Sequence, residues 1–119
     1  MGNKSIEPIE VTNAIWKTAK RLEKGVDTIT SKAKEYAYAE KNYRIALRKE
    51  IVKLRTDKMP VTLIADIARG SDDVAELKFK RDLAEQCFKA SRDMLNALST
   101  EVSSLQSILK VQARIEWGD

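Results

Sequence analysis

The chain has 119 residues and a net charge of +4, and 43% of its residues are apolar, which is enough for one domain with a core. Aromatic residues make up only 6% and charged residues 34%, a balance typical of long charged helices and unlike that of an all-β domain. With no histidine and one cysteine, the chain lacks a Cys/His zinc set, a histidine base and an intramolecular disulfide. We therefore expect no enzymatic activity, no metal site and no cofactor.

The sequence also lacks the signals of membrane insertion and export. No stretch of about 18 apolar residues occurs, and its beginning has no long apolar run of the secretory type. We expect a cytoplasmic protein without a membrane partner. Cys87 has no histidine to activate it, so we interpret it as a small apolar helix residue in a reducing compartment.

The first half of the chain predicts helix in two segments. Pro8 suits a first helical turn, because the N–H that proline lacks would have no partner there. An N-terminal helical segment is expected within residues 1–31. Gly25 and the following β-branched residues predict a bend or break near residues 25–31, and a basic helix is expected over residues 32–58.

Both segments carry one heptad-like seam of apolar residues. Its positions alternate steps of four and three, and only Glu40 and Glu50 interrupt it. The seam positions are 15, 19, 22, 26, 29, 33, 36, 40, 43, 47, 50 and 54. Such a seam predicts pairing with a second long helix.

A connector over residues 59–71 separates this half from the next helix. Met59-Pro60 ends the basic helix, because the residue before a proline is pushed out of the α region. The apolar run from Val61 to Arg69 predicts a helical turn or two at the tip of a hairpin. Gly70 is expected to stop this turn, and Ser71 with the two following aspartates predicts an acidic helix start.

The last helix is expected over residues 72–117 and repeats the seam. Its positions are 74, 77, 81, 84, 88, 91, 95, 98, 102, 105, 109 and 112, with Arg81, Ser91 and Gln112 as interruptions. Two long helices joined by a short connector lie antiparallel and bury their seams against each other. The sequence therefore predicts a single all-α domain over residues 1–119, built as a long coiled-coil-like antiparallel hairpin.

Positive charge is concentrated in the first half of the chain. Residues 1–60 carry 14 basic and 8 acidic groups, whereas residues 61–119 carry 8 basic and 10 acidic groups. Several basic residues of the basic helix fall within about 60° of one another, a stripe that can follow a phosphate backbone. The candidate nucleic-acid-binding residues are Lys41, Arg44, Arg48, Lys49, Lys53 and Arg55, with Tyr38 as a candidate base stacker. An ordinary solvated helix face is the open alternative.

A second apolar band on the basic helix predicts self-association. Ile45 and Val52 lie seven residues apart and away from the seam, and one hairpin partner cannot cover both faces. We expect a homo-oligomer, with an interface comprising Ile45, Val52, Leu95, Leu98, Val102, Leu105 and Leu109. The alternative is that residues 8–24 fold back after Gly25 to cover this band.

The order of these elements resembles small helical proteins of tailed phages, and more widely the phage recombination-mediator (UvsY-like) family. The segments that carry the resemblance are Tyr43-Arg44-Ile45-Ala46-Leu47, Met59-Pro60-Val61-Thr62-Leu63-Ile64, Ala68-Arg69-Gly70, Asp73-Val74-Ala75-Glu76-Leu77 and Asp93-Met94-Leu95-Asn96-Ala97-Leu98. The resemblance implies an oligomer that binds single-stranded DNA and helps a RecA-type recombinase displace single-strand-binding protein. The competing hypothesis is a helical interaction protein, such as an inhibitor of a host protein or an assembly chaperone, that binds no nucleic acid.

Overall fold

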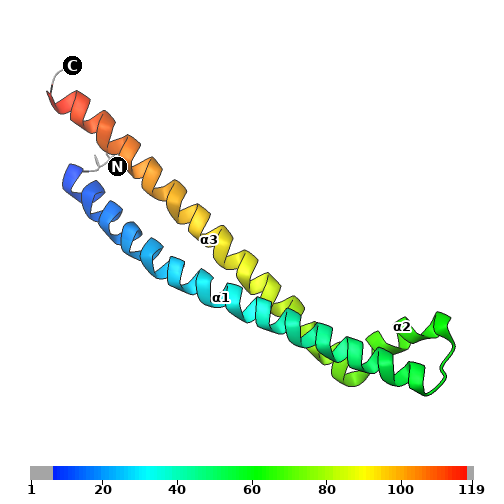
Figure 1. Cartoon of the computed structure of the whole chain (residues 1–119). Coiled ribbons are helices and arrows are strands. Elements are labelled where there is room, and N and C mark those ends of the chain that lie inside the picture. The colour runs from blue at the N-terminus through cyan, green and yellow to red at the C-terminus, as the bar shows by residue number, and fades with distance from the viewer. Residues whose placement is uncertain (1–6, 118–119) are drawn as a thin grey trace, which may run out of the picture. The chain divides into compact units, whose positions relative to one another are not determined.

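The computed structural model describes residues 7–117, and these residues form three α-helices and no strand (Figure 1). The helices are α1 (Pro8–Thr56), α2 (Val61–Gly70) and α3 (Asp72–Trp117). The predicted all-α class is confirmed. The described residues divide into two compact units, a central unit of residues 30–90 and a terminal unit of residues 7–29 with 91–117.

The helix α1 begins where the sequence predicts and then continues further than predicted. The carbonyl of Glu7 accepts hydrogen bonds from the backbone N–H groups of Glu10 and Val11, which places Pro8 in the first turn. The predicted break near residues 25–31 is wrong, because α1 is continuous from Pro8 to Thr56. The alternative in which residues 8–24 fold back is excluded for the same reason.

In the central unit, α1 and α3 lie side by side and antiparallel (Figure 1). Tyr36 of α1 packs against Phe88 of α3, with ring centroids 6.3 Å apart. One turn later in α1, Glu40 pairs with Arg81, which lies earlier in α3. The predicted hairpin pairing is therefore present in this unit.

The connector contains a longer helix than the predicted turn or two. Ten residues of the connector form α2. Ile64 and Ala68 bury one face of α2 against Leu54 of α1. Leu47, Ile51 and Met59 complete this cluster. Burial of these apolar side chains explains why a short helix is stable at the tip of the hairpin.

The end of α1 is set by backbone hydrogen bonds rather than by Pro60 alone. The N–H of Met59 donates to the carbonyl of Leu54, and the N–H of Lys58 donates to that of Arg55. These two bonds form a Schellman motif, in which the residue after the helix takes the left-handed conformation. Lys58 occupies that position with φ 61°, where glycine is the usual residue.

A single residue separates α2 from α3. The hydroxyl of Ser71 donates to the carbonyl of Ala68, 3.1 Å away, and its backbone carbonyl accepts from the N–H of Ala75. Ser71 therefore ends α2 with its side chain and begins α3 with its backbone. The predicted acidic start is confirmed, because Asp72 and Asp73 lie in the first turn of α3.

In the terminal unit, the predicted seam of α1 holds at four positions but not at Val26; the four half-buried residues are Ile15, Ala19, Leu22 and Ile29. Val11 and Thr18 are buried, whereas the predicted seam residue Val26 is exposed. Gly25 instead faces α3, where a Cβ built on it would overlap Cδ2 of Leu95 and lie 3.3 Å from its Cγ. Absence of a side chain at Gly25 thus lets the two helices approach at Leu95.

The seam of α3 agrees with the sequence pattern throughout. All twelve predicted positions are buried or half-buried, and Val74 and Leu98 are the most enclosed. Even Arg81 and Ser91, which interrupt the apolar pattern, lie on the enclosed side. Helical periodicity alone therefore identified the face of α3 that packs.

Candidate nucleic-acid interface

The six predicted basic residues all project from one stretch of α1 in the central unit and are all exposed. Four of them form the basic face, because on a continuous helix they fall within about 60° of one another: Lys41, Arg44, Arg48 and Arg55. Lys49 and Lys53 project from a different side of α1. The structure therefore brings together four of the six basic residues that the sequence singled out.

Arg44 differs from the other members because it has an acidic partner. Its Nε lies 2.6 Å from Oε1 of Glu40, in the preceding turn of α1. The charge of Arg44 is thus compensated within its own helix. Among the residues that the structure describes, the other five predicted basic side chains form no ion pair with an acidic residue.

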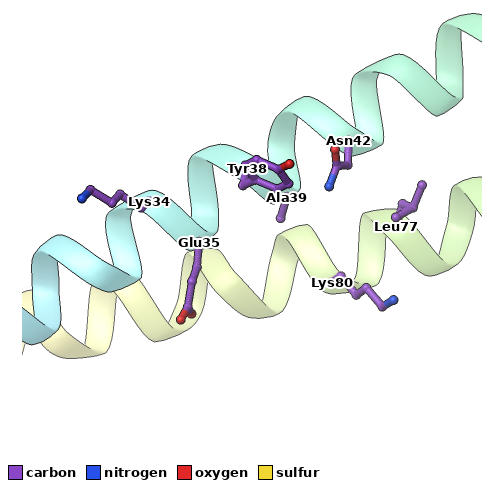
Figure 2. Close-up of a pocket in the computed structure, with 7 residues that line it drawn as sticks. All are labelled: Lys34, Glu35, Tyr38, Ala39, Asn42, Leu77 and Lys80. Atoms are coloured by element: carbon purple, nitrogen blue, oxygen red, sulfur yellow. The ribbon is translucent and has the colours of Figure 1, made fainter.

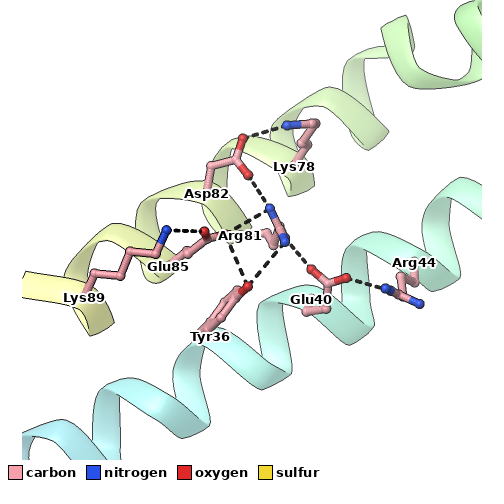
Figure 3. A network of polar contacts seen from close by, with 8 residues as sticks. All are labelled: Tyr36, Glu40, Arg44, Lys78, Arg81, Asp82, Glu85 and Lys89. Atoms are coloured by element: carbon pink, nitrogen blue, oxygen red, sulfur yellow. Dashed lines mark hydrogen bonds and ion pairs between the residues drawn. The ribbon is translucent and has the colours of Figure 1, made fainter. Parts of the chain in front are cut away.

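A network of polar contacts joins α1 to α3 beside the basic face (Figure 3). Arg81 of α3 is at its centre and donates to the carboxylate of Glu40 and to the hydroxyl of Tyr36. The same guanidinium lies 2.8 Å from Asp82 and 3.1 Å from Glu85 on α3. Arg81 interrupts the apolar seam, and these partners compensate its charge.

The network shifts the pKa values of its carboxyl groups in one direction. Hydrogen bonds from Arg44 and then Arg81 lower the pKa of Glu40. Hydrogen bonds from Lys78 and Arg81 lower the pKa of Asp82, and a hydrogen bond from Lys89 does the same for the pKa of Glu85. All three groups are therefore carboxylates at neutral pH, which suits a cross-helix bridge and not proton transfer.

Apolar side chains accompany the arginines on the same side of α1. Arg44, Arg48 and Arg55 border a shallow groove of about 580 Å³ that also includes Leu47, Ile51 and Val52. Ile51 is half-buried by the α2 cluster, whereas Val52 is 56% exposed. This surface combines cations with apolar area, a combination suited to a ligand with charged and flat apolar parts.

The three tyrosines of α1 lie where the sequence predicts, two on the seam and one on the exposed side. Tyr36 is half-buried against Phe88 and donates a hydrogen bond to Glu85, and Tyr43 is half-buried on the seam. Tyr38 is 64% exposed, and Nζ of Lys41 lies 4.9 Å from the centroid of its ring. A cation and an exposed aromatic ring therefore stand next to each other at the edge of the basic face.

Sequence reasoning missed a groove that lies beside Tyr38, between α1 and α3 (Figure 2). This Tyr38 groove has a volume of about 420 Å³, and Tyr38, Ala39 and Leu77 supply its apolar lining. Lys34 and Lys80 stand at its border. No local pattern in the sequence reports such a groove, because it requires residues of two helices.

The predicted oligomer-interface residues fall into two groups. Ile45 and Val52 are exposed on α1 in the central unit. The remaining five, Leu95, Leu98, Val102, Leu105 and Leu109, are buried or half-buried on the seam face of α3. Leu95 is in contact range of Gly25, so at least this part of the seam is occupied by α1 of the same chain.

Exposed apolar residues that the sequence did not single out lie on α2 and on α3. Val61, Leu63 and Ile67 are exposed on α2. Phe79 and Leu83, one turn apart on α3, are 62% and 53% exposed. The helical spacing of 79 and 83 outside the α3 seam was the available signal.

The described residues form an all-α protein with a basic helix face. Within residues 7–117, no group of three or more acidic or cysteine side chains is placed to hold a metal ion. No helix in this range is long and apolar enough to cross a membrane. Comparisons with protein families, characterised proteins and solved structures find no match to this chain.

Proposed function

We propose that this protein binds single-stranded DNA through the basic face of α1 and acts as a non-enzymatic accessory in recombination. The observation that carries the proposal is the basic face, where Lys41, Arg48 and Arg55 are exposed and have no acidic partner among the described residues. Such cations release counterions when they meet phosphates, so they favour a polyanion. Rigid helical spacing lets them follow the backbone together.

Tyr38 favours a single strand over a duplex. Its exposed ring lies next to Lys41, so a base that stacks on the ring places its phosphate near a cation. Bases of a duplex are already stacked on their neighbours, whereas those of a single strand are free to stack on an aromatic side chain. This preference agrees with the mediator role that the sequence resemblance implies.

Self-association is part of the proposal, because one subunit offers few phosphate contacts. Ile45 and Val52 on α1 expose apolar area that a second copy would cover. In an oligomer, each added subunit raises the effective concentration of contacts along the same strand. A RecA-type recombinase or single-strand-binding protein in the cytoplasm is the proposed protein partner.

The proposal is tested by fluorescence anisotropy with a labelled single strand at several salt concentrations. The wild type is expected to bind with a slope of about −0.7 in log affinity against log salt for each phosphate neutralised. The variant Arg48→Glu/Arg55→Glu should bind more weakly and with a smaller slope, because it removes two phosphate contacts.

The matched control is Lys24→Glu/Lys110→Glu, which changes the net charge equally at two exposed positions of the terminal unit. This control should keep most of the affinity and the slope. Equal loss in both variants would show that only net charge matters, and absence of wild-type binding at low salt would exclude the nucleic-acid function.

A helical interaction protein that binds no nucleic acid is the second candidate. It is favoured by α2, where Leu63 and Ile67, one turn apart, expose an apolar face. Such a face fits an apolar groove or helix on a protein partner. The second candidate takes precedence if the wild type fails to bind a single strand at low salt.

A further inference from the structure

The Tyr38 groove combines an apolar lining with a cationic border. Tyr38 and Ala39 of α1 face the same groove as Leu77 of α3, and Lys34 and Lys80 flank it from the two helices (Figure 2). Asn42 adds an amide, which carries both hydrogen-bond donors and an acceptor. The groove therefore offers an aromatic ring, apolar contacts and one adaptable polar group in a small space.

Positive side chains outnumber the one negative side chain that lines the groove. Lys34 and Lys80 form no ion pair with any acidic side chain among residues 7–117. The one acidic residue that lines the groove, Glu35, is 3.3 Å from Nζ of Lys32 and is thereby compensated. Lys34 and Lys80 line the groove, and Nζ of Lys41 lies 4.9 Å from the centroid of the Tyr38 ring.

We infer that the Tyr38 groove holds one unstacked base of the single strand, with the base on the ring of Tyr38 and its neighbouring phosphates near Lys34, Lys41 and Lys80. This inference rests on the proposed function and names the site where a base, rather than the backbone, is bound. A nucleotide fits the groove because it joins a flat, weakly polar ring to phosphate anions. An apolar peptide would leave the three lysines without partners.

The position of Tyr38 links this groove to the basic face. Tyr38 lies three residues before Lys41 in α1 and about 60° from it around the helix, so a strand bound at Lys41 reaches the groove by passing around the exposed side of α1. Phosphates on the basic face and a base in the groove then belong to the same strand. Base contacts of this kind are sequence-tolerant, because every base has a flat face.

The test compares two strands of equal length and phosphate number, one of thymidines and one of abasic sites, by fluorescence anisotropy. The wild type is expected to bind the thymidine strand about tenfold more tightly. Tyr38→Ala should lose that preference, keep the affinity for the abasic strand and keep the salt slope, because no phosphate contact is removed. Tyr38→Phe should retain the preference, since stacking needs only the ring.

The matched control is Phe79→Ala, which removes an aromatic ring of nearly equal exposure that does not line the groove. It should leave the preference for thymidine unchanged. Photocrosslinking of a strand that contains 5-iododeoxyuridine is expected to attach to Tyr38, and the attachment point is read by mass spectrometry.

Four results would overturn the inference. Equal wild-type binding of the two strands would leave the phosphate-binding function in place and exclude the base site. An equal loss of preference in Phe79→Ala, or a crosslink confined to another segment, would exclude the Tyr38 groove in particular. Failure of the wild type to bind either strand at low salt would overturn the proposed function together with the inference.

Discussion

Arg81 of α3 donates a hydrogen bond to Glu40 of α1, and Glu40 also accepts one from Arg44 of the basic face. A single carboxylate thus connects the helix pairing of the central unit to one residue of the candidate interface (Figure 3). The bridge lies on the seam, where an apolar residue would be expected from the heptad pattern. It positions Arg44 while leaving Arg48 and Arg55 free of acidic partners among the described residues.

We predict that this cross-helix pair contributes to stability more than an exposed pair between the same helices. A double-mutant cycle with Glu40→Gln and Arg81→Gln should give a clear favourable coupling in urea unfolding. The control cycle is Arg21→Gln with Glu101→Gln, whose charged atoms are 3.8 Å apart and well exposed. Exposed pairs contribute little, so its coupling should be close to zero. Equal couplings would show that the network of Arg81 has no special role.

Acidification should destabilise the central unit. The pKa values of Glu40, Asp82 and Glu85 are lowered in the folded protein, so their contribution is complete above the ordinary carboxyl pKa of about 4. It is lost as the pH falls through the lowered values, because the folded state must then bind protons that the unfolded state already holds. Urea midpoints measured from pH 7 to pH 2.5 should fall, and less steeply in Glu40→Gln.

Because α1 and α3 approach closely at Gly25, a methyl group added there should not stabilise the protein. Gly25→Ala raises helix propensity by about 1 kcal/mol, but the new Cβ overlaps the side chain of Leu95. We expect little gain or a loss in the wild-type background. In a Leu95→Ala background the same change should stabilise by about 1 kcal/mol, because the obstacle is gone.

Thermal unfolding of the four proteins, the wild type, both single variants and the double variant, checks this prediction. Gly70→Ala is the control for the added methyl group, since a Cβ built on Gly70 meets nothing within 4 Å. A full stabilisation by Gly25→Ala with Leu95 intact would show that Leu95 moves aside at no cost.

The left-handed residue after α1 offers a stabilising substitution. Lys58 has φ 61°, a conformation that costs a residue with a Cβ about 1 kcal/mol relative to glycine. Lys58→Gly should therefore raise the free energy of unfolding by about that amount. Lys58→Ala serves as the control, because alanine also carries a Cβ and should bring no such gain.

The apolar area at Val52 should support self-association. Light scattering behind a sizing column should give a mass above the 13.5 kDa of one chain, increasing with concentration. Val52→Glu should reduce this mass without loss of helicity. Val26→Glu, at a position of nearly equal exposure in the terminal unit, should not. A monomer at all concentrations would contradict the prediction.

Features that depend on neighbouring residues were predictable from the sequence. The seam of α3 and the starts of α1 and α3 follow from the period of the helix and from hydrogen bonding in its first turn. The basic face is of the same kind, because the spacing of residues 44, 48 and 55 on a helix determines that they share a side.

The remaining features could not be predicted from the pattern of one helix, because they depend on contacts with the second helix. The low helix propensity of Gly25 predicts a break, yet α1 continues through this residue. The close contact with Leu95 explains why a residue without a side chain stands there. The partner of Arg44 could be found on its own helix, but the bridge from Glu40 to Arg81 spans 41 residues of sequence. The Tyr38 groove likewise needs Leu77 and Lys80 of α3. Periodicity determines which side of a helix is apolar, whereas the register between two helices decides which side chains meet, and register depends on packing over the whole contact.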